Sequence, residues 1–349
     1  MPLIHRLYPL LRPLLFQLDA ETAHEWTVKL LRAGHLLGML PDPEPNPSKA
    51  RTVMGLKFPN CVGLAAGMDK SASAVDAWSA LGFGHVEVGT LTPRPQPGNP
   101  TPRLFRLIEQ EGIINRMGFN NPGIDEAVYR LERRTSTGIV GVNIGKNFDT
   151  PLENAVDDYL TCLRKAYQVA DYITVNISSP NTKGLRDLQA EEPIRRLLGS
   201  LKEEQGRLEG VHGVHRPLLV KIAPDLGEEQ IEVLAKVFVE LGMDGVIATN
   251  TTIEREGVKK NKLWKEAGGL SGKPLLRQST AIIATLALAL KSEAKGTPPP
   301  PIIGVGGIMG EMDAEAKLQA GAALVQVYSG LVYRGPKLIA EVAGIPNTV

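Results

Sequence analysis

A short polar cluster, Asn176-Ile177-Ser178-Ser179-Pro180-Asn181-Thr182, closes a β-rich run that begins at Tyr172. It holds two amides and three hydroxyls but no histidine, cysteine or carboxylate. Because proline removes a backbone donor and ends a strand, the polar side chains are expected to project from a rigid strand end. An elaborate turn is the alternative, since Ser, Asn and Pro are common turn formers. The cluster predicts a polar site if similar residues gather around it.

Eight apolar, β-rich runs recur along the chain, and most end in glycine or a small polar residue. They are Cys61 to Gly67, His85 to Thr90, Gly138 to Gly145, Tyr172 to Ser179, Leu218 to Pro224, Gly245 to Thr252, Ile302 to Gly307 and Leu324 to Gly330. Helical spacing marks the stretches Pro151 to Ala170, Glu191 to Leu208, Gly227 to Leu241, Pro274 to Leu290 and Asp313 to Ala320. Alternating strands and helices favour parallel pairing, and continuous apolar strands indicate burial on both faces. We therefore predict a (β/α)8 TIM barrel, with a doubly wound open sheet as the alternative.

In such a barrel, chemistry gathers at the carboxyl ends of the strands. The polar residues of this chain lie at those predicted ends: Lys70, Thr90, Asn143, Asn176, Ser179, Lys221, Thr249, Asn250, Thr251, Tyr328 and Ser329. The cluster around Ser179 is thus expected to share one site with them.

The composition limits the classes of function. The formal net charge is +1, from 39 basic and 38 acidic residues, so no overall attraction to nucleic acid is expected. Cys61 and Cys162 are too few for a disulfide framework or a thiolate metal site. His212 and His215 lie in a Gly/His/Arg loop, where solvated side chains are expected. We predict no metal site.

Residues 1–40, here called the arm, differ from the rest. Leucines recur at helical spacing from Leu3 to Leu18, and a second amphipathic stretch follows Asp19, which could cap it, as could Thr22. Arginines interrupt the apolar run, so it is too short to span a bilayer. A helical hairpin packed on the barrel and a pair of helices dipping into lipid both remain open. Residues 41–60 are expected to form a proline-rich linker and strands at the barrel bottom, and residues 61–349 the barrel.

Glycines at the last two predicted strands indicate a phosphate site. Strand seven ends Gly304-Val305-Gly306-Gly307 and strand eight ends Tyr328-Ser329-Gly330. In many barrels the loops after these strands bind phosphate through backbone N–H groups, although simple turns would also use glycine. Lys221 would face the barrel mouth, where a cation needs an anionic partner such as a reduced flavin. Since no nucleophile–base pair is evident, an organic cofactor is expected to carry the chemistry.

Eight motifs follow one another at the predicted strand ends. They are Leu64 to Lys70, Gly89 to Pro100, Asn115 to Asn120, Asn176 to Arg186, Lys221 to Asp225, Asn250 to Thr252, Gly269 to Gly272 and Val327 to Gly330. Together they resemble the quinone-dependent (class 2), membrane-associated dihydroorotate dehydrogenases over nearly the whole chain. That family oxidises dihydroorotate to orotate with FMN in pyrimidine biosynthesis.

The resemblance implies roles for individual residues. FMN would be held by Ala66, Gly67, Thr90, Asn143, Asn176, Lys221, Thr249, Gly272, Gly307, Tyr328 and Ser329. Substrate would meet Lys70, Asn115, Arg116, Met117, Gly118, Phe119, Asn176, Asn181, Asn250 and Thr251. Ser179 would be the catalytic base, with Thr182 or a water as proton relay, because a free serine is a poor base.

The resemblance also implies an electron acceptor and a location. His24, Arg106 and Tyr328 would line a tunnel for a membrane quinone, either ubiquinone or menaquinone. The arm would place the enzyme peripherally on the cytoplasmic face of the cell (inner) membrane. The soluble class of the family carries cysteine where this chain has Ser179, which favours the quinone-linked class. The chain departs from the family pattern at Ser71-Ala72, where Asn or Asp followed by Gly is usual, so the local turn is expected to differ.

Three other functions compete with this one. A soluble relative passing electrons to fumarate or NAD is disfavoured by Ser179 and the arm. A flavin enzyme acting on transfer RNA should show a basic face, which the balanced charge does not suggest. A non-catalytic binding module would be purified without yellow colour. The segment Ile253 to Gly268, polar and rich in lysine, is expected to flank the pocket mouth.

Overall fold

The computed structural model describes residues 3–40 and 46–347, and its centre is a closed barrel of parallel strands. Each predicted run supplies one strand, and β13 pairs with β3 to close the ring. The strands are β3 (Val62–Leu64), β4 (His85–Leu91), β7 (Ile139–Ile144), β8 (Tyr172–Asn176), β9 (Leu218–Ile222), β10 (Gly245–Ala248), β12 (Ile302–Val305) and β13 (Ala322–Val327). Most end before the predicted runs do, because the polar carboxyl ends leave the ladder as loops. The predicted barrel is confirmed.

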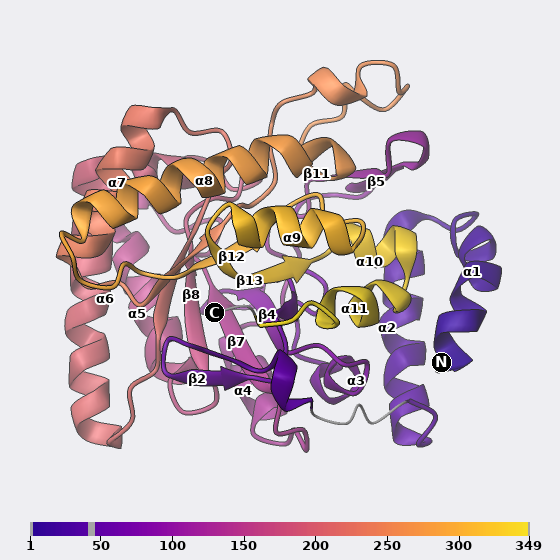
Figure 1. Ribbon diagram of the computed structural model, residues 1–349, viewed down its shortest axis with the longest axis horizontal. Coiled ribbons are helices and arrows are strands. Elements are labelled where there is room, and N and C mark those ends of the chain that lie inside the picture. The colour runs from indigo at the N-terminus through magenta and orange to yellow at the C-terminus, as the bar shows by residue number, and fades with distance from the viewer. Residues whose placement is uncertain (1–2, 41–45, 348–349) are drawn as a thin grey trace.

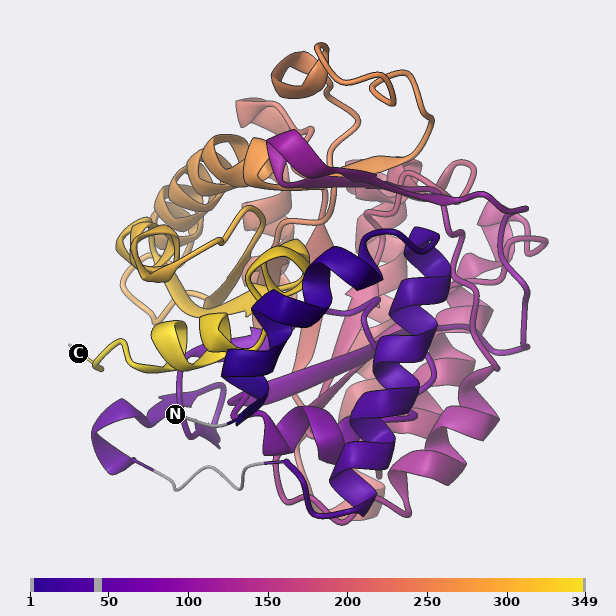
Figure 2. The same cartoon turned by 90° about the vertical axis from the view of Figure 1, so that its right-hand side faces the viewer.

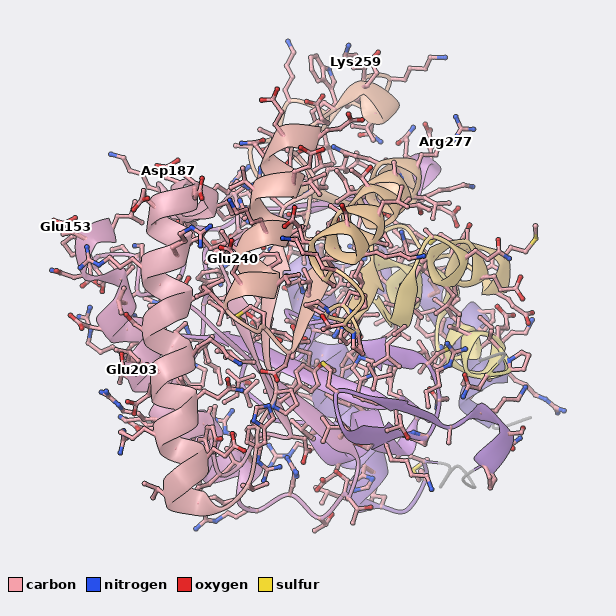
Figure 3. All side chains as sticks on the ribbon, turned by 60° about the vertical axis from the view of Figure 1, so that its left-hand side comes forward. Glu153, Asp187, Glu203, Glu240, Lys259 and Arg277 are labelled. Atoms are coloured by element: carbon pink, nitrogen blue, oxygen red, sulfur yellow. The ribbon has the colours of Figure 1, made fainter. Side chains whose placement is uncertain are left out.

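Helices surround the barrel and cover its outer face (Figure 1). They are α3 (Val75–Ala80), α4 (Ile124–Leu131), α5 (Ala155–Ala166), α6 (Glu191–His212), α7 (Glu228–Glu240), α8 (Leu276–Glu293), α9 (Glu311–Gln319), α10 (Ser329–Arg334) and α11 (Lys337–Ala343). Their apolar sides join the main core, whereas charged side chains such as Glu203 and Glu240 point outward (Figure 3). This amphipathic pattern explains why α5 to α9 could be predicted from spacing, whereas the shorter α3, α4, α10 and α11 were not predicted.

Glycines inside the barrel make room for two large rings. A Cβ atom on Gly63 would lie 2.0 Å from the His85 ring, and one on Gly141 would lie 2.1 Å from the Tyr172 ring. The hairpin of β1 (Arg51–Val53) and β2 (Leu56–Phe58) adds Phe58, whose ring packs edge-on against His85 at 5.3 Å between centroids. Bulky and small residues therefore alternate across the interior, which is packed rather than open. The predicted linker residues 41–45 lie outside the described residues.

A second sheet, which the sequence analysis did not predict, lies beside the barrel. It is antiparallel and contains β5 (Leu104–Leu107), β6 (Gly112–Asn115) and β11 (Gly269–Gly272), in the order β11-β6-β5. Asn115 and Gly272 belong to it, so it carries residues that were predicted to contact ligands. The segment 253–268 projects at the same end of the molecule (Figure 1).

The arm forms the two expected helices, α1 (Leu3–Leu15) and α2 (Ala20–Leu36), which lie side by side against the barrel (Figure 2). Asp19 caps α2 by accepting from the backbone N–H groups of Glu21 and Thr22. The Tyr8 hydroxyl donates to the Val332 carbonyl at 2.5 Å. Within the described residues, no helix is both long and apolar enough to cross a membrane.

Candidate active site

A pocket of about 960 Å³, part of it open to solvent, lies at the carboxyl ends of the barrel strands. Most residues predicted for cofactor, substrate or catalysis line it. These are Ala66, Gly67, Lys70, Thr90, Asn115, Met117, Gly118, Phe119, Asn176, Ser179, Asn181, Lys221, Thr249, Asn250, Thr251, Gly272, Gly307, Tyr328 and Ser329. The strand ends therefore bring together residues that lie up to 263 positions apart, from Ala66 to Ser329.

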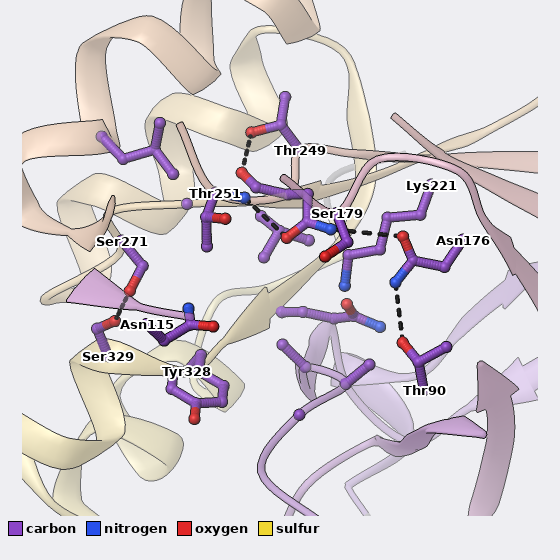
Figure 4. Close-up of a pocket in the computed structure, with 18 of the residues that line it drawn as sticks. Thr90, Asn115, Asn176, Ser179, Lys221, Thr249, Thr251, Ser271, Tyr328 and Ser329 are labelled. Atoms are coloured by element: carbon purple, nitrogen blue, oxygen red, sulfur yellow. Dashed lines mark hydrogen bonds between the residues drawn. The ribbon is translucent and has the colours of Figure 1, made fainter. Parts of the chain in front are cut away.

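Side-chain amides form a hydrogen-bonded chain along one side of the pocket. The Asn176 amide donates to the Thr90 hydroxyl at 2.9 Å (Figure 4). Ser178 donates to the side-chain oxygen of Asn176 at 3.0 Å. Asn250 donates to the Ser178 hydroxyl at 2.9 Å, and Asn181 donates to Asn115 at 3.2 Å. Amides held in this way present both donors and acceptors to a planar polar ring.

Ser179 lies in this pocket, 5% exposed, on the loop that follows β8. Its hydroxyl accepts from the backbone N–H of Asn181 at 3.2 Å, which leaves its own proton available to another acceptor. Arg186 supports the loop by donating to the Ser178 carbonyl at 3.1 Å and pairing with Asp225 at 2.7 Å. Both residues lie in motifs at the predicted strand ends, but nothing in the local sequence indicates that they pair.

Lys70 is a half-buried cation on the wall of the pocket. Its ammonium donates to Asn120, and it also contacts the Met117 sulfur. Burial, aided by the nearby Arg103 guanidinium, lowers the pKa of Lys70 to about 7. Such an ammonium favours a carboxylate ligand, which would relieve the desolvation cost.

The opposite end of the pocket is built from glycine and serine. Gly306 and Gly307 have φ of 114° and 80°, and a Cβ atom on Gly307 would lie 2.4 Å from the Leu276 Cα atom at the start of α8. Ser329 and Ser271 share a hydrogen bond of 2.8 Å there (Figure 4). Backbone held this close to a helix start, with hydroxyls beside it, suits a phosphate.

The chemistry of the lining fits FMN from end to end. Polar groups and Lys221 lie at one side, the glycine and serine end lies at the other (Figure 4), and the lining between them includes the apolar Ala65, Val305 and Val327. A flavin mononucleotide has the matching parts: a polar pyrimidine edge, an apolar ring system and a phosphate. The donor set on the protein therefore accommodates this cofactor.

The cationic Lys221 already has a protein partner, which the sequence analysis missed. Its ammonium lies 3.8 Å from the Glu87 carboxylate, and both side chains are buried. Burial lowers the pKa of Lys221, while the Glu87 charge opposes that shift. A carboxylate in the middle of the apolar run His85 to Thr90 was the feature that could have revealed it. Glu87 is thus an anionic partner of Lys221 in addition to the reduced flavin that the sequence led us to expect.

Three predicted residues do not line the pocket. Asn143 lies beneath it, accepting from Thr90 at 2.6 Å and donating to Glu87 at 2.8 Å. Arg116 pairs with Glu266 at 2.5 Å, because side chains alternate after β6 and Asn115 takes the inward position. Thr182 is buried in the turn after Pro180, and within the described chain its hydroxyl makes no direct bond to Ser179.

A second, apolar pocket of about 880 Å³ lies between the arm and the barrel. His24, Arg106 and Tyr328, the residues predicted for the quinone, all line it. Tyr328 also lines the first pocket, so the two cavities share this residue. Burial lowers the pKa of His24 to about 4, which keeps its ring neutral at neutral pH.

Arg106 fixes the arm over this pocket. Its guanidinium donates to the Leu15 carbonyl at 3.0 Å and to the Leu18 carbonyl, and it lies 4.8 Å from the centre of the Phe16 ring. It is therefore not an ordinary surface arginine.

Within the described residues, no cluster of three or more His, Cys, Asp or Glu side chains could hold a metal. The His215 ring forms hydrogen bonds with the carboxylates of Glu209 and Asp244, at 2.7 and 2.8 Å.

Comparison with known proteins agrees with this geometry. The family model described as dihydroorotate dehydrogenase matches residues 48–346. A dihydroorotate dehydrogenase (quinone) from Nitrosomonas eutropha is 56% identical over 338 residues, covering 97% of this chain and 97% of that protein. The chain belongs to the quinone-dependent dihydroorotate dehydrogenase family. It is accordingly an oxidoreductase.

Other members of the dihydroorotate dehydrogenase family support the assignment. A protein of the same name from Chromobacterium violaceum is 56% identical and covers 97% of this chain and 96% of its own length. The ligand-free crystal structure of the Eimeria tenella enzyme superposes with a TM-score of 0.85 at 40% identity, covering 93% of each chain. The structure of that enzyme with ferulenol gives the same TM-score at 39% identity, covering 93% of this chain and 89% of that one.

Proposed function

We propose that this protein oxidises (S)-dihydroorotate to orotate with FMN as prosthetic group, and that a membrane quinone accepts the electrons, in the biosynthesis of UMP. The observation that carries the proposal is the pair of cavities that share Tyr328. One is polar and carries Ser179, amides and a lysine; the other is apolar and opens beneath the arm. Separate sites of opposite polarity suit a polar electron donor and a lipid-soluble acceptor.

The lining residues provide a place for FMN. Gly307 and Ser329 would hold the phosphate, while Ala66, Gly67 and Gly272 let backbone approach the ring, and the polar edge would meet Thr90, Asn176, Lys221 and Thr249. Asn143 would act from beneath by fixing the Thr90 hydroxyl. When bound, FMN accepts the hydride from C6 of the substrate and passes the electrons on to the quinone.

Substrate recognition is assigned to a lysine and four asparagines. The Lys70 ammonium would bind the carboxylate, and Asn115, Asn176, Asn181 and Asn250 would satisfy the donors and acceptors of the pyrimidine ring. Phe119 would cover the apolar edge, beside Met117, Gly118 and Thr251.

Ser179 is proposed as the base that removes the C5 proton. A serine hydroxyl needs a second acceptor for its own proton, and Thr182, reached through a water, is the candidate for that relay. The substrate carbon must therefore lie on the Ser179 side of the pocket.

The apolar cavity is proposed as the quinone site, lined by the neutral ring of His24, by Arg106 and by Tyr328. Exposed leucines on the arm, among them Leu10 and Leu14, would attach it peripherally to the cytoplasmic face of the cell (inner) membrane. Ubiquinone and menaquinone both fit a lining of this kind. We propose no nucleic acid partner.

Separating the two half-reactions tests this function. The purified holoenzyme is mixed anaerobically with dihydroorotate, and bleaching of the flavin is followed; ubiquinone or menaquinone is then added to restore the colour. Ser179→Ala should slow bleaching by about a hundredfold or more, the usual value of a positioned base. Colourless protein, or yellow protein that dihydroorotate does not bleach, would contradict the proposal.

A pair of histidine variants tests the quinone half. His24→Leu should slow the return of colour with quinone and leave bleaching unchanged. His35→Leu, on the same helix but outside the apolar cavity, is the matched control and should affect neither step. If both variants lose the same amount of activity with quinone, the effect comes from disturbance of the helix and not from the cavity.

A further inference from the structure

One carboxylate, that of Glu87, lies fully buried in the barrel interior and collects donors from four other strands. Asn143 of β7 donates to it at 2.8 Å, and Gln326 of β13 at 2.9 Å. Tyr172 and Thr174 of β8 donate at 3.1 and 3.3 Å, and the ammonium of Lys221 on β9 lies 3.8 Å away.

The partners of Glu87 reach the floor of the pocket at three points. Lys221 and Gln326 line the pocket themselves, and Asn143 holds Thr90, which also lines it. The carboxylate is thus one residue away from the pocket through Lys221 and through Gln326, and two residues away through Asn143 and Thr90, without lining it.

Charge balance identifies which neighbour of Glu87 supplies its counter-charge. A buried carboxylate is costly without a counter-charge, and so is a buried ammonium. Two other titratable rings belong to the same cluster: Tyr172 donates to Glu87, and His85 contacts Gln326 and Tyr172. Burial and the Glu87 charge raise the pKa of Tyr172 well above its usual value, and burial lowers the pKa of His85 to about 3. Both rings are therefore neutral at neutral pH, and among the described residues around Glu87 only Lys221 supplies a positive charge.

We propose that Glu87 is a positioning residue of the reaction, which keeps Lys221 as an ammonium at the pocket floor before negative charge develops above it. The inference rests on the proposed binding of FMN in this pocket. With Lys221 charged in advance, reduction of the bound flavin takes up two electrons and one proton. Without Glu87, the desolvated lysine is neutral in the oxidised enzyme, and reduction takes up two electrons and two protons, the second on the lysine.

Glu87→Gln is a suitable variant because the network can adapt to it. The Tyr172 and Thr174 hydroxyls can rotate to accept from the new amide. Within the described residues, the Gln326 side-chain oxygen is buried without a hydrogen-bond partner, so a flip of that amide would also provide an acceptor. Glu87→Asp is the matched control, since it disturbs the same hydrogen bonds but keeps the charge.

The experiment is a potentiometric titration of the bound flavin with dithionite between pH 6 and 8.5. Wild type and Glu87→Asp should show one proton per two electrons, and Glu87→Gln two. Two protons in wild type, or one in a flavin-loaded Glu87→Gln variant, would overturn the proposal. If Glu87→Gln does not retain flavin, two protons in wild type would still overturn the proposal, and one proton would support it. Wild-type protein that purifies without flavin would instead count against the proposed function.

Discussion

Ala72 shows how a single residue can be held against its own preference. It follows Lys70 by two positions and has φ of 52°, in the left-handed region that favours glycine. Asp69 fixes the turn by accepting from the backbone N–H groups of Ser73 and Ala74, both at 2.8 Å. The departure from the family pattern therefore leaves alanine in a left-handed turn that Asp69 holds.

Ala72→Gly should accordingly stabilise the protein. Relief of the left-handed strain, about 1–2 kcal/mol, exceeds the entropy cost of glycine, about 0.5–1 kcal/mol. The denaturation midpoint in urea should rise. Ala74→Gly, at φ of −135°, is the control and should lower the midpoint; a lower midpoint in Ala72→Gly would show that the turn is unstrained.

The lowered pKa of the single residue Lys70 should make ligand binding depend on pH. Its pKa of about 7 means that the free enzyme loses the ammonium as pH rises through that value. Because a carboxylate ligand binds the charged form, the affinity for orotate should fall by up to about tenfold per pH unit above 7. Titrating orotate from pH 6 to 8.5 measures this. Lys70→Gln should bind weakly with a flat profile; a flat wild-type profile would contradict the lowered pKa.

At the scale of elements, the arm has two sides with different tasks. One side packs on the barrel through contacts such as the ion pair between Arg103 and Glu21, at 2.6 Å. The other carries exposed apolar side chains, with Leu10 72% and Leu14 61% exposed on α1. Both alternatives left open by the sequence, a packed hairpin and a lipid-facing surface, are thus compatible with the same two helices.

Replacing the two exposed leucines tests the lipid-facing side. Leu10→Ser with Leu14→Ser should weaken binding to vesicles by on the order of tenfold or more, since each leucine contributes roughly 1 kcal/mol or more when buried in lipid. Co-sedimentation with vesicles measures the change. Leu288→Ser, at a 71% exposed site on α8, is the matched control and should bind like wild type. Equal binding by all three proteins would remove these leucines from the attachment surface.

At the scale of the whole molecule, a buried lysine links folding to pH. The Lys317 side chain of α9 is fully buried, and it donates to the Ser279 and Thr280 hydroxyls of α8 at 2.7 and 3.1 Å. Burial lowers its pKa to about 7, from 10.5. Between these values the unfolded chain binds a proton that the folded chain does not, so stability rises with pH.

Lys317→Met should therefore be more stable than wild type near pH 7, with the difference shrinking as pH rises. The two unfolding free energies should converge by up to about 1.4 kcal/mol per pH unit. Urea denaturation at pH 7, 8 and 9 measures them. Lys70, also lowered to about 7, is present in both proteins and cancels in the comparison. Parallel curves would show that Lys317 remains charged in the folded state across this range.

The sequence by itself determined the barrel strands, most of the helices and most of the pocket lining. Apolar runs such as Leu218 to Pro224 and amphipathic stretches such as Gly227 to Leu241 are local patterns that burial imposes on each element. Once the strands are parallel, their polar ends must meet, which is why the sequence alone predicts that Thr90, Asn176 and Thr249 lie together.

Only the tertiary structure decided which side chains face one another across the barrel. The pairing of Lys221 with Glu87, the turn of Arg116 toward Glu266 and the position of Tyr328 between two cavities all join distant segments. Such contacts depend on strand register, barrel closure and the direction of each side chain, where a shift of one residue reverses inward and outward faces. Local sequence patterns carry no information about register across the barrel, so these contacts could not be read from them.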